Sequence, residues 1–580
     1  MRTAWPPHRV ARFVREYFGI PDTQHMICGI SFGYAEDAHP VNQFRTTRSA
    51  VDDLMRFARA RRSRIARALR CAHRMRGQGE SNMAARIHEL LDRWLSEAPA
   101  RPFIHLPDRS LTYADVGALA DRLERELHAD GVRRGDRVLV VAENCPEHAA
   151  LLIACSRIGA WSCGVNARMA PGEVDAFAAK ADARVLYFTS GISSAAGAHA
   201  ARHDARPSCV NGLARSAVHA AARPEPEPLA SDVAAIIFTS GTTGAPKGVM
   251  MTHRGVLHFA RVSAESRALG PDDRVYAYAP MTHIFGLGTV LLASLHAGAA
   301  LEMRAQFEPA ELFDAVARRR VSQVQGPPTL FSRLLRHCAE HRIARPDTPC
   351  LRYLYAGAGP LDIALKQQVE ALFGQTLHHG YGLSEYAGSL HATRLGEARA
   401  DTSAGYAFPG AELRIVDPAD GRPLPAGKRG EIWLRGVGLM PGYFRDPQAT
   451  ADVMRDGGWY ASGDLGELHD DGALFIVGRL KEMIVRSGFN VYPGEVEQAL
   501  NRFPGILNSA VVGQREADGN EAVVAFVELD AARPLDETAL GLYLREQLAP
   551  YKHPGRIIPV DALPFNSNGK LMRRQLLERL

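Results

Sequence analysis

The 580-residue chain has 46% hydrophobic and 23% charged residues, a globular composition that excludes a disordered or fibrous protein. Its eight cysteines form no C-x-x-C pair, which argues against a zinc site and a disulfide framework. The best candidate for a membrane span, TVLLASLHAGAAL, is interrupted by His296, and the first residues, MRTAWPPHRVARF, lack the apolar core of a signal peptide. We therefore expect a cytoplasmic protein without a transmembrane segment.

The net charge of +5 comes from one segment of the chain. Residues 54–79 hold nine arginines and no acid, so the remainder carries 5 − 9 = −4. A basic run of this kind can bind nucleic acid or a membrane surface, which defines one hypothesis for the whole protein. A solvated linker explains the run more simply, because runs of like charge are usually solvated. We expect no nucleic-acid partner.

The sequence pattern of the first 82 residues is not typical of the start of a globular domain. Residues 1–57 resemble the C-terminal end of a nitroreductase, through a GIP turn, a G-x-x-x-GY stretch and the tail VNQFRTTR. A nitroreductase builds its flavin site from the whole fold, so we expect residues 1–60 to be a remnant that binds no flavin. Residues 61–82 are interpreted as an arginine-rich linker, and an amphipathic helix opens near Met83.

Between residues 83 and 478, apolar strand-like runs alternate with amphipathic stretches. RVLVVAE (137–143) and ARVLYFTS (183–190) are predicted strands, and CPEHAALLIACSRIGA (145–160) is a predicted helix. This alternation predicts an α/β domain with largely parallel sheets. After Gly478 the units become shorter, including a helix from Pro493 and two apolar strands, which predicts a small α+β domain over residues 479–580.

The stretch IIFTSGTTGAPKGVMMTH (236–253) combines glycines, hydroxyl side chains and Lys247. It does not have the G-x-x-x-x-G-K-[ST] order of the P-loop, which opens a helix. We instead predict a loop between two strands, with a helix starting near His253. Hydroxyls, exposed backbone N–H groups and an ammonium suit phosphate, and glycine lets the backbone approach it closely.

Several motifs in order make residues 83–580 similar to the adenylate-forming superfamily, which includes acyl-CoA synthetases. They are TSGTTGAPKG, YAGAGPL (355–361), HHGYGLSE (378–385), YASGDLG (460–466), GRLKE (478–482) and PFNSNGKLMRR (564–574). The resemblance implies a large N-terminal domain of layered sheets and helices with a small mobile C-terminal domain. It also implies ATP and coenzyme A as substrates and Mg²⁺ as a cofactor.

The resemblance implies a nucleotide site built from these motifs. Asp464 would accept hydrogen bonds from the ribose, with Arg479 beside the same sugar. Glu385 and Thr239 would hold Mg²⁺, a hard cation that prefers oxygen ligands. The full set of implied nucleotide-binding residues is Thr239, Ser240, Gly241, Thr242, Thr243, Gly244, Lys247, Gly357, Ala358, Gly359, Gly380, Tyr381, Gly382, Asp464 and Arg479.

The implied catalytic residues are Lys570, Glu385, His283 and Ser384. Lys570 would bridge the attacking carboxylate and the α-phosphate, where charge develops. Ser384 stands where the family usually has threonine, so the hydroxyl is retained. Lys481 occupies the family's hinge position, and the implied coenzyme A contacts are Ser487, Gly488 and Phe489.

The identity of the acid substrate is the property that the sequence predicts least directly. YAPMTHIFGLGTVLLASLHAGA (278–299) resembles the family's acyl segment, and residues 280–301 contain no acid, lysine or arginine. An amino acid or a dicarboxylate would need a charged partner there. We therefore predict an acid–CoA ligase that activates a hydrophobic monocarboxylate, either fatty or aryl. The alternatives are an acyl-AMP ligase that loads a separate carrier protein, and the nucleic-acid- or membrane-binding protein described above.

Overall fold

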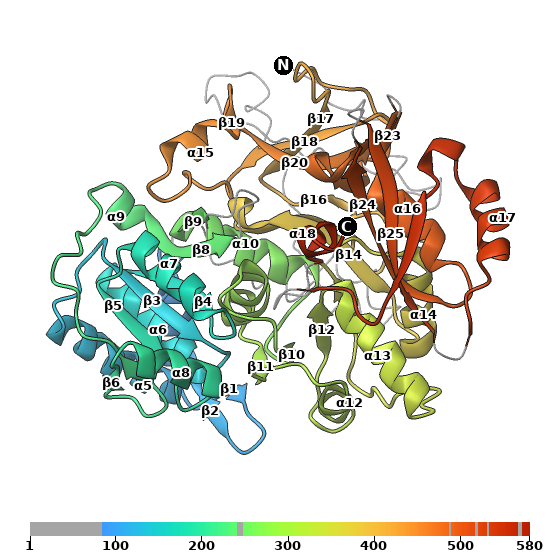
Figure 1. Ribbon diagram of the computed structural model, residues 1–580. Coiled ribbons are helices and arrows are strands. Elements are labelled where there is room, and N and C mark those ends of the chain that lie inside the picture. Colours follow the sequence, from blue (N-terminus) through green and yellow to red (C-terminus); the bar gives the residue numbers. More distant parts are fainter. Residues whose placement is uncertain (1–83, 240–246, 487–488, 517–519, 531–532, 566–570) are drawn as a thin grey trace, which may run out of the picture. The chain divides into compact units, whose positions relative to one another are not determined.

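The computed structural model describes residues 84–239, 247–486, 489–516, 520–530, 533–565 and 571–580 (Figure 1). The nitroreductase-like segment and the arginine-rich run lie outside these residues, as do Ser240, Gly241, Thr242, Thr243, Gly244, Ser487, Gly488 and Lys570. Within the described residues, helices alternate with parallel strands in a large N-terminal domain, which confirms the predicted α/β class.

One sheet joins seven of the described strands in the order β6-β7-β5-β3-β4-β8-β9, with a parallel centre. The predicted strands at 137–143 and 183–190 are confirmed as β3 (Arg137–Ala142) and β5 (Val185–Phe188). Every residue of β3 is buried, as expected for a strand covered on both faces. The other strands are β4 (Trp161–Asn166), β6 (Arg206–Pro207), β7 (Ala214–Arg215), β8 (Val233–Thr239) and β9 (Lys247–Thr252).

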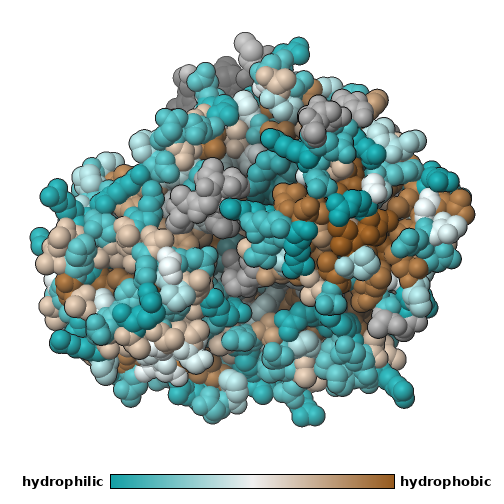
Figure 2. All heavy atoms as spheres, in the orientation of Figure 1, coloured by the Kyte–Doolittle hydropathy of each residue, from teal (hydrophilic) through white to brown (hydrophobic). Residues whose placement is uncertain are grey.

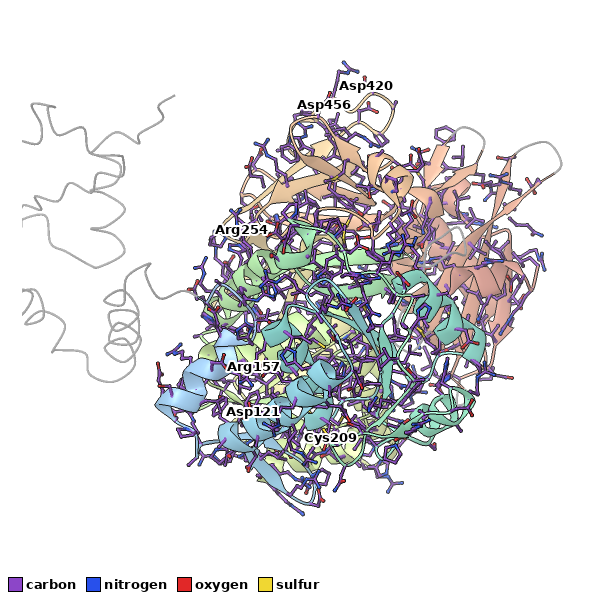
Figure 3. The ribbon with its side chains drawn as sticks, turned by 90° about the vertical axis from the view of Figure 1, so that its left-hand side faces the viewer. Asp121, Arg157, Cys209, Arg254, Asp420 and Asp456 are labelled. Carbon is purple, nitrogen blue, oxygen red and sulfur yellow. The ribbon has the colours of Figure 1, made fainter. Side chains whose placement is uncertain are left out.

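Helices connect and cover these strands, because parallel neighbours need a crossover. The predicted helix at 145–160 is confirmed as α6 (Pro146–Ile158), which begins with proline and ends at Gly159 in the left-handed region. Arg157 of α6 points toward Asp121 of the adjacent α5 and donates to it at 2.6 Å (Figure 3). The remaining helices here are α4 (Glu89–Glu97), α5 (Tyr113–Ala129), α7 (Pro171–Ala181), α8 (Ser194–Arg202) and α9 (Leu229–Asp232).

A second sheet joins nine of the described strands in the order β16-β15-β14-β13-β12-β10-β11-β1-β2. Its centre is parallel, and β14, β15 and β16 pair antiparallel at one side. The strands are β1 (Pro102–His105), β2 (Ser110–Thr112), β10 (Arg274–Ala277), β11 (Ala300–Met303), β12 (Gln323–Gly326), β13 (Tyr353–Ala356), β14 (Leu377–Leu383), β15 (Gly388–Ala392) and β16 (Tyr406–Ala407).

The second sheet is covered by helices on both faces (Figure 1). On one face lie α12 (Pro309–Arg318), α13 (Pro328–Glu340) and α14 (Ile363–Phe373). On the other lie α10 (His253–Ser266), the π-helix η4 (Phe285–Leu292) and α11 (Ala293–Ala297). The start of α10 at His253 confirms the predicted helix after the phosphate loop, and Thr252 caps it by accepting from the Gly255 N–H.

A third, antiparallel sheet completes the large domain. It contains β17 (Ala411–Val416), β18 (Arg429–Gly436), β19 (Met454–Arg455), β20 (Trp459–Leu468) and β21 (Leu474–Arg479). Its edge strand β19 follows the short helix α15 (Pro447–Ala451). Strand β21 ends at Arg479, so the third sheet leads the chain directly into the predicted hinge segment, which is the short 3₁₀ helix η6 (Leu480–Glu482).

The small C-terminal domain mixes strands and helices, as the shorter units of the sequence predict. Its strands are β22 (Ile484–Arg486), β23 (Phe489–Val491), β24 (Ile506–Arg515), β25 (Glu521–Leu529) and β26 (Arg556–Val560). Its helices are α16 (Pro493–Asn501), α17 (Glu537–Gln547), η7 (Pro550–Lys552) and α18 (Arg573–Leu577). Figure 2 shows hydrophobic residues gathered over β24 and β25. Among the described residues, no helix is both long and apolar enough to cross a bilayer.

Candidate active site

A cleft of about 1370 Å³ collects most of the described residues that the motifs single out. Its lining includes Thr239, Lys247, His283, Ala358, Gly380, Gly382, Ser384, Glu385, Asp464, Arg479 and Lys481. Gly357, Gly359, Tyr381 and Phe489 are described but do not line it. Motifs spread over more than 240 positions of the sequence therefore meet at one place.

The ends of β8 and β9 hold the phosphate-loop residues that the structure describes. Thr239 and Lys247 are register partners in this antiparallel pair, so the predicted strand–loop–strand arrangement is confirmed at both strand ends. Nζ of Lys247 lies 4.8 Å from the ring centroid of Tyr443, within the range of a cation–π contact. This contact places the ammonium at the cleft wall.

Tyr443 also holds the carboxylate of Glu385. Its hydroxyl donates to Glu385 Oε1 at 2.9 Å and lies 3.3 Å from the hydroxyl of Tyr460. Burial, and then the Glu385 carboxylate, raise the pKa of Tyr443, so its phenol remains protonated as a donor. Tyr443 is a cleft-lining residue that sequence reasoning missed, because an isolated tyrosine in a loop carries no recognisable motif, whereas Tyr460 opens the predicted motif YASGDLG.

The chemistry of the donor set fits Mg²⁺. The part of the chain that the structure describes has no group of three or more His, Cys, Asp or Glu side chains arranged around a metal. Mg²⁺ bound with a nucleotide needs less, since it usually takes one or two carboxylates and fills its other positions with phosphate oxygens and water. The Glu385 carboxylate and the Thr239 hydroxyl, both in the cleft lining, are oxygen donors of this type.

Asp464 is held by two neighbours, one on each carboxylate oxygen. The Tyr381 hydroxyl donates to Oδ2 at 2.7 Å, and Nε of Arg479 lies 3.2 Å from Oδ1. Asp464 and Arg479 are register partners of β20 and β21, which explains why the motifs SGD and GR occur about 15 residues apart. Burial, and then the Asp464 charge, raise the pKa of Tyr381. The arrangement fixes a carboxylate at the cleft wall with lone pairs for further donors.

The glycines of the predicted adenine segment lie where backbone passes close to side chains. A Cβ on Gly357 would come 2.6 Å from Cε1 of Tyr355, and one on Gly380 would come 2.3 Å from the Tyr355 hydroxyl oxygen. Ala358, which directly follows Gly357, has a φ of 61°, in the left-handed region. Packing against Tyr355 therefore explains these two glycines independently of any ligand.

The predicted acyl segment forms a wall that is largely aromatic. Phe285 and Tyr355 stack with centroids 6.2 Å apart, and Tyr278 and Phe307 lie 5.2 Å apart. The N–H of Phe285 donates to Nδ1 of His283 at 3.2 Å, which orients that imidazole at the start of the π-helix. π-Helical segments are rare and frequently lie at functional sites.

Two basic groups of α13 reach the cleft from outside the segment 280–301. Arg333 and Arg336 line the cleft, and the guanidinium carbon of Arg333 lies 4.6 Å from the Phe307 ring centroid. The sequence argument from residues 280–301 is right about that segment, but it does not describe the whole cavity. Helix α13 begins 27 residues after the segment ends, and no motif in its sequence predicts that it lines the same cleft.

The small domain presents one of its two predicted functional segments to the cleft. Phe565 and Met572, which flank residues 566–570, line the cleft, whereas Phe489 is 54% exposed and stacks on Tyr551 at 4.6 Å. Lys481 also lines the cleft, and burial, followed by the charge of Arg479, lowers its pKa. Of the described residues next to these two segments, Phe565 and Met572 line the cleft and Phe489 does not.

Comparison with known proteins confirms the resemblance to the adenylate-forming superfamily. A family model described as AMP-binding enzyme matches residues 91–444, and one described as AMP-binding enzyme C-terminal domain matches residues 495–570. A 4-coumarate–CoA ligase 2 from Solanum tuberosum is 32% identical over 85% of this chain and 94% of its own. A feruloyl-CoA synthase from Amycolatopsis is 35% identical over 81% of this chain and 94% of its own.

Among solved structures, the ATP-bound MatB of Rhodopseudomonas palustris has 29% sequence identity and a TM-score of 0.75, covering 85% of this chain and 98% of its own. The family models begin at residue 91, so the nitroreductase resemblance gains no support from them and remains a prediction outside the described residues. The boundaries at residues 478 and 479 also remain predictions. The chain belongs to the AMP-binding enzymes, an adenylate-forming family, and within it to the acid–CoA ligase type.

Proposed function

We propose that this acid–CoA ligase activates an aryl carboxylic acid rather than a fatty acid. The observation that carries the proposal is the aromatic wall of the cleft, where Tyr278, Phe285 and Phe307 contribute rings to the lining. Aromatic side chains favour offset or edge contacts with another ring, which a flat acid can make and an aliphatic chain cannot. The names 4-coumarate–CoA ligase and feruloyl-CoA synthase among the relatives support the same choice.

In the first half-reaction, the carboxylate attacks the α-phosphorus of ATP, and pyrophosphate leaves. Asp464 accepts hydrogen bonds from the ribose hydroxyls, and Lys247 offsets phosphate charge from its position beside Tyr443. Lys570 bridges the carboxylate and the α-phosphate as they approach, and Ser384 donates to the α-phosphate. Glu385 and Thr239 would hold Mg²⁺, which when bound would supply positive charge that reduces repulsion between the two anions.

In the second half-reaction, coenzyme A attacks the acyl adenylate and AMP leaves. We assign this step to a second orientation of the small domain, reached by rotation at Lys481. That rotation exchanges the segment around Lys570 for residues 487–489. The orientation in the structure, with Phe565 and Met572 in the cleft lining, suits the first half-reaction.

The test is a panel of acids assayed with coenzyme A and without it. Aryl acids should give AMP and pyrophosphate in equal amounts, with thioester forming only when coenzyme A is present. A preference for long-chain fatty acids over every aryl acid would overturn the choice of substrate. Stoichiometric ADP would overturn cleavage between the α- and β-phosphates. Transfer to a purified carrier protein but not to coenzyme A would favour the carrier-loading alternative.

The basic-run hypothesis has a separate test. Binding to nucleic acid or anionic vesicles should be absent in moderate salt if residues 54–79 are only a linker. Binding that persists and depends on those arginines would give the chain a second activity beside the ligase.

A further inference from the structure

Behind the aromatic wall of the cleft lies a group of buried polar side chains that the reaction described above does not use. We call Arg267, Gln323, Gln325, Tyr353 and Tyr355 the inner cluster. Gln323 pairs with Tyr353 and Gln325 with Tyr355 in the parallel β12–β13 register, so these four side chains project from the same face of the sheet. Arg267, at the end of α10, lies close enough to both tyrosines to interact with them electrostatically.

The inner cluster contains an unusual number of unpaired polar atoms. Arg267 is 1% exposed, and Gln323 and Gln325 are 0% and 1% exposed. Among the described residues, Nε and Nη1 of Arg267, both side-chain polar atoms of Gln323 and Nε2 of Gln325 have no hydrogen-bond partner. A buried polar atom without a partner costs free energy, and each such atom in a native protein needs an explanation.

The positive charge of Arg267 is also uncompensated. Its one hydrogen bond runs from Nη2 to the carbonyl oxygen of Thr289 at 2.6 Å, and no carboxylate lies within ion-pair distance among the described residues. Asp273, an acid near it, is already bound to Arg352 at 2.5 Å. Burial lowers the pKa of Arg267 to about 10, which leaves the guanidinium charged at neutral pH. A buried unpaired cation of this kind attracts an anion.

The inner cluster adjoins the acyl end of the cleft. Thr289, whose carbonyl binds Arg267, is itself part of the cleft lining, as are Phe285, which stacks on Tyr355, and Ser389, which lies 3.2 Å from the Tyr355 hydroxyl. His283 lies just before the π-helix η4 and Thr289 lies within it, so the inner cluster lies further along the acyl segment than His283. An acid with one aromatic ring between two polar ends is of the class that can extend from His283 toward Thr289.

We propose that the inner cluster binds a second oxyanion on the substrate, a carboxylate or an ionised phenol at the end of the ring opposite the activated carboxylate. Arg267 would pair with this oxyanion through one of its unpartnered nitrogens, Nε or Nη1, and the amide of Gln323 or Gln325 would donate to it. The proposal rests on the aryl-acid function proposed above and narrows the class of acid. It assigns Arg267 as a specificity-determining residue.

Four acids of the same shape separate charge from size. They are cinnamate, 4-coumarate, 4-nitrocinnamate and 4-carboxycinnamate; the nitro compound matches the carboxylate in shape without its net charge. The measured quantity is kcat/KM for pyrophosphate release, together with stabilisation of the protein by each acid in thermal denaturation without ATP. We expect 4-carboxycinnamate, or 4-coumarate at a pH where its phenol ionises, to exceed cinnamate and 4-nitrocinnamate at least tenfold.

Variants then identify the side chain that binds the oxyanion. Arg267→Met should remove about 10- to 100-fold of that preference, the range for losing a charged hydrogen-bond partner, while activity on cinnamate changes little. Arg267→Lys should keep part of the preference. Gln323→Leu removes a neutral partner of similar size and should lower the same ratio less. Arg318→Met, at a side chain 82% exposed, is the matched control and should leave the ratio unchanged.

Three results would overturn the inference. One is a wild-type protein that activates cinnamate and the charged acids equally. A second is an Arg267→Met protein that loses activity on all four acids in proportion, which would show a structural role. The third result applies if Arg267→Met does not fold. It is an acid preference that stays unchanged in both Gln323→Leu and Arg267→Lys. Failure of the aryl-acid proposal itself looks different, because then none of the four acids releases pyrophosphate.

Discussion

The hydroxyl of Tyr443 donates to Oε1 of Glu385 at 2.9 Å, while the ring of the same tyrosine lies 4.8 Å from Nζ of Lys247. One side chain therefore fixes both the carboxylate proposed for Mg²⁺ and the ammonium proposed for phosphate. Tyr443 also pairs with Val249 in an isolated β-bridge, which connects this loop to β9. The position of the metal ligand and that of the phosphate lysine are thus mechanically linked.

This link predicts different effects for two substitutions. Glu385→Gln removes a charge that holds the metal, so adenylation should fall on the order of 10² to 10³. Tyr443→Phe keeps the ring beside Lys247 and removes only the donor, so the loss should be nearer tenfold. Pyrophosphate exchange measured against Mg²⁺ concentration distinguishes them, since Glu385→Gln should also raise the Mg²⁺ requirement. Equal losses in both variants would contradict the assignment of Glu385 as the ligand.

The pair of Asp464 with Arg479 and Tyr381 predicts a binding defect. Asp464→Asn keeps the shape but weakens acceptance from the ribose hydroxyls and leaves Arg479 without its charge partner. The KM for ATP should rise at least tenfold, about 1.4 kcal/mol, with a smaller change in kcat. Tyr381→Phe serves as the comparison, because it removes one hydrogen bond at 2.7 Å and leaves the carboxylate in place. An unchanged KM for ATP in Asp464→Asn would place the ribose elsewhere.

Two substitutions in the small domain should separate the half-reactions. Lys570→Ala should fail to make acyl-AMP, with a loss on the order of 10² to 10³, yet still convert supplied acyl-AMP and coenzyme A to thioester. Gly488→Leu should do the reverse, because a side chain there would obstruct the thiol path. If both variants fold and both lose both half-reactions, the two domain orientations are contradicted. If Gly488→Leu leaves thioester formation unchanged, the path of coenzyme A does not pass Gly488.

The secondary structure was largely predictable because its signals are local. The buried run of β3 and the helix α6 lie within one or two residues of their predicted bounds. The helix predicted to open near Met83 starts later, at Glu89. The composition of residues 84–88 suits a helix, but His88 provides no side-chain cap, and the regular turns begin only with the acidic first turn of α4.

The site residues that belong to a sequence motif could be predicted, whereas the site residues that are positioned by packing could not. Asp464 and Arg479 meet because their strands pair, which the spacing of the two motifs permits. Nothing in the local sequence marks Tyr443, Arg333 or Arg267, because each reaches its place through contacts between distant segments. The residues of the acyl segment alone therefore did not predict the polar side chains that surround the acyl cavity.

The N-terminal segment predicts an experiment on the whole chain. A shortened chain beginning at Met83 should keep full ligase activity, because the family models match residues 91–444 and 495–570. Neither that chain nor the full-length protein should bind flavin, which absorbance after purification checks. A loss of activity beyond about tenfold, about 1.4 kcal/mol in transition-state terms, would show that residues 1–82 support the active site.

Buried histidines predict how stability depends on pH. Burial lowers the pKa of His148, which is 4% exposed beside Leu152 and Leu291, from 6.5 to about 4. Between pH 6.5 and about 4 the unfolded chain therefore binds a proton at this position that the native protein does not. The resulting stabilisation is fully present above pH 6.5 and is lost as the pH falls toward 4, amounting to at most about 3 kcal/mol. His148→Leu should flatten the dependence of the unfolding free energy on pH in that window. Urea unfolding at several pH values measures this dependence, and an unchanged slope in His148→Leu would mean that His148 is protonated in the native protein or reached by water.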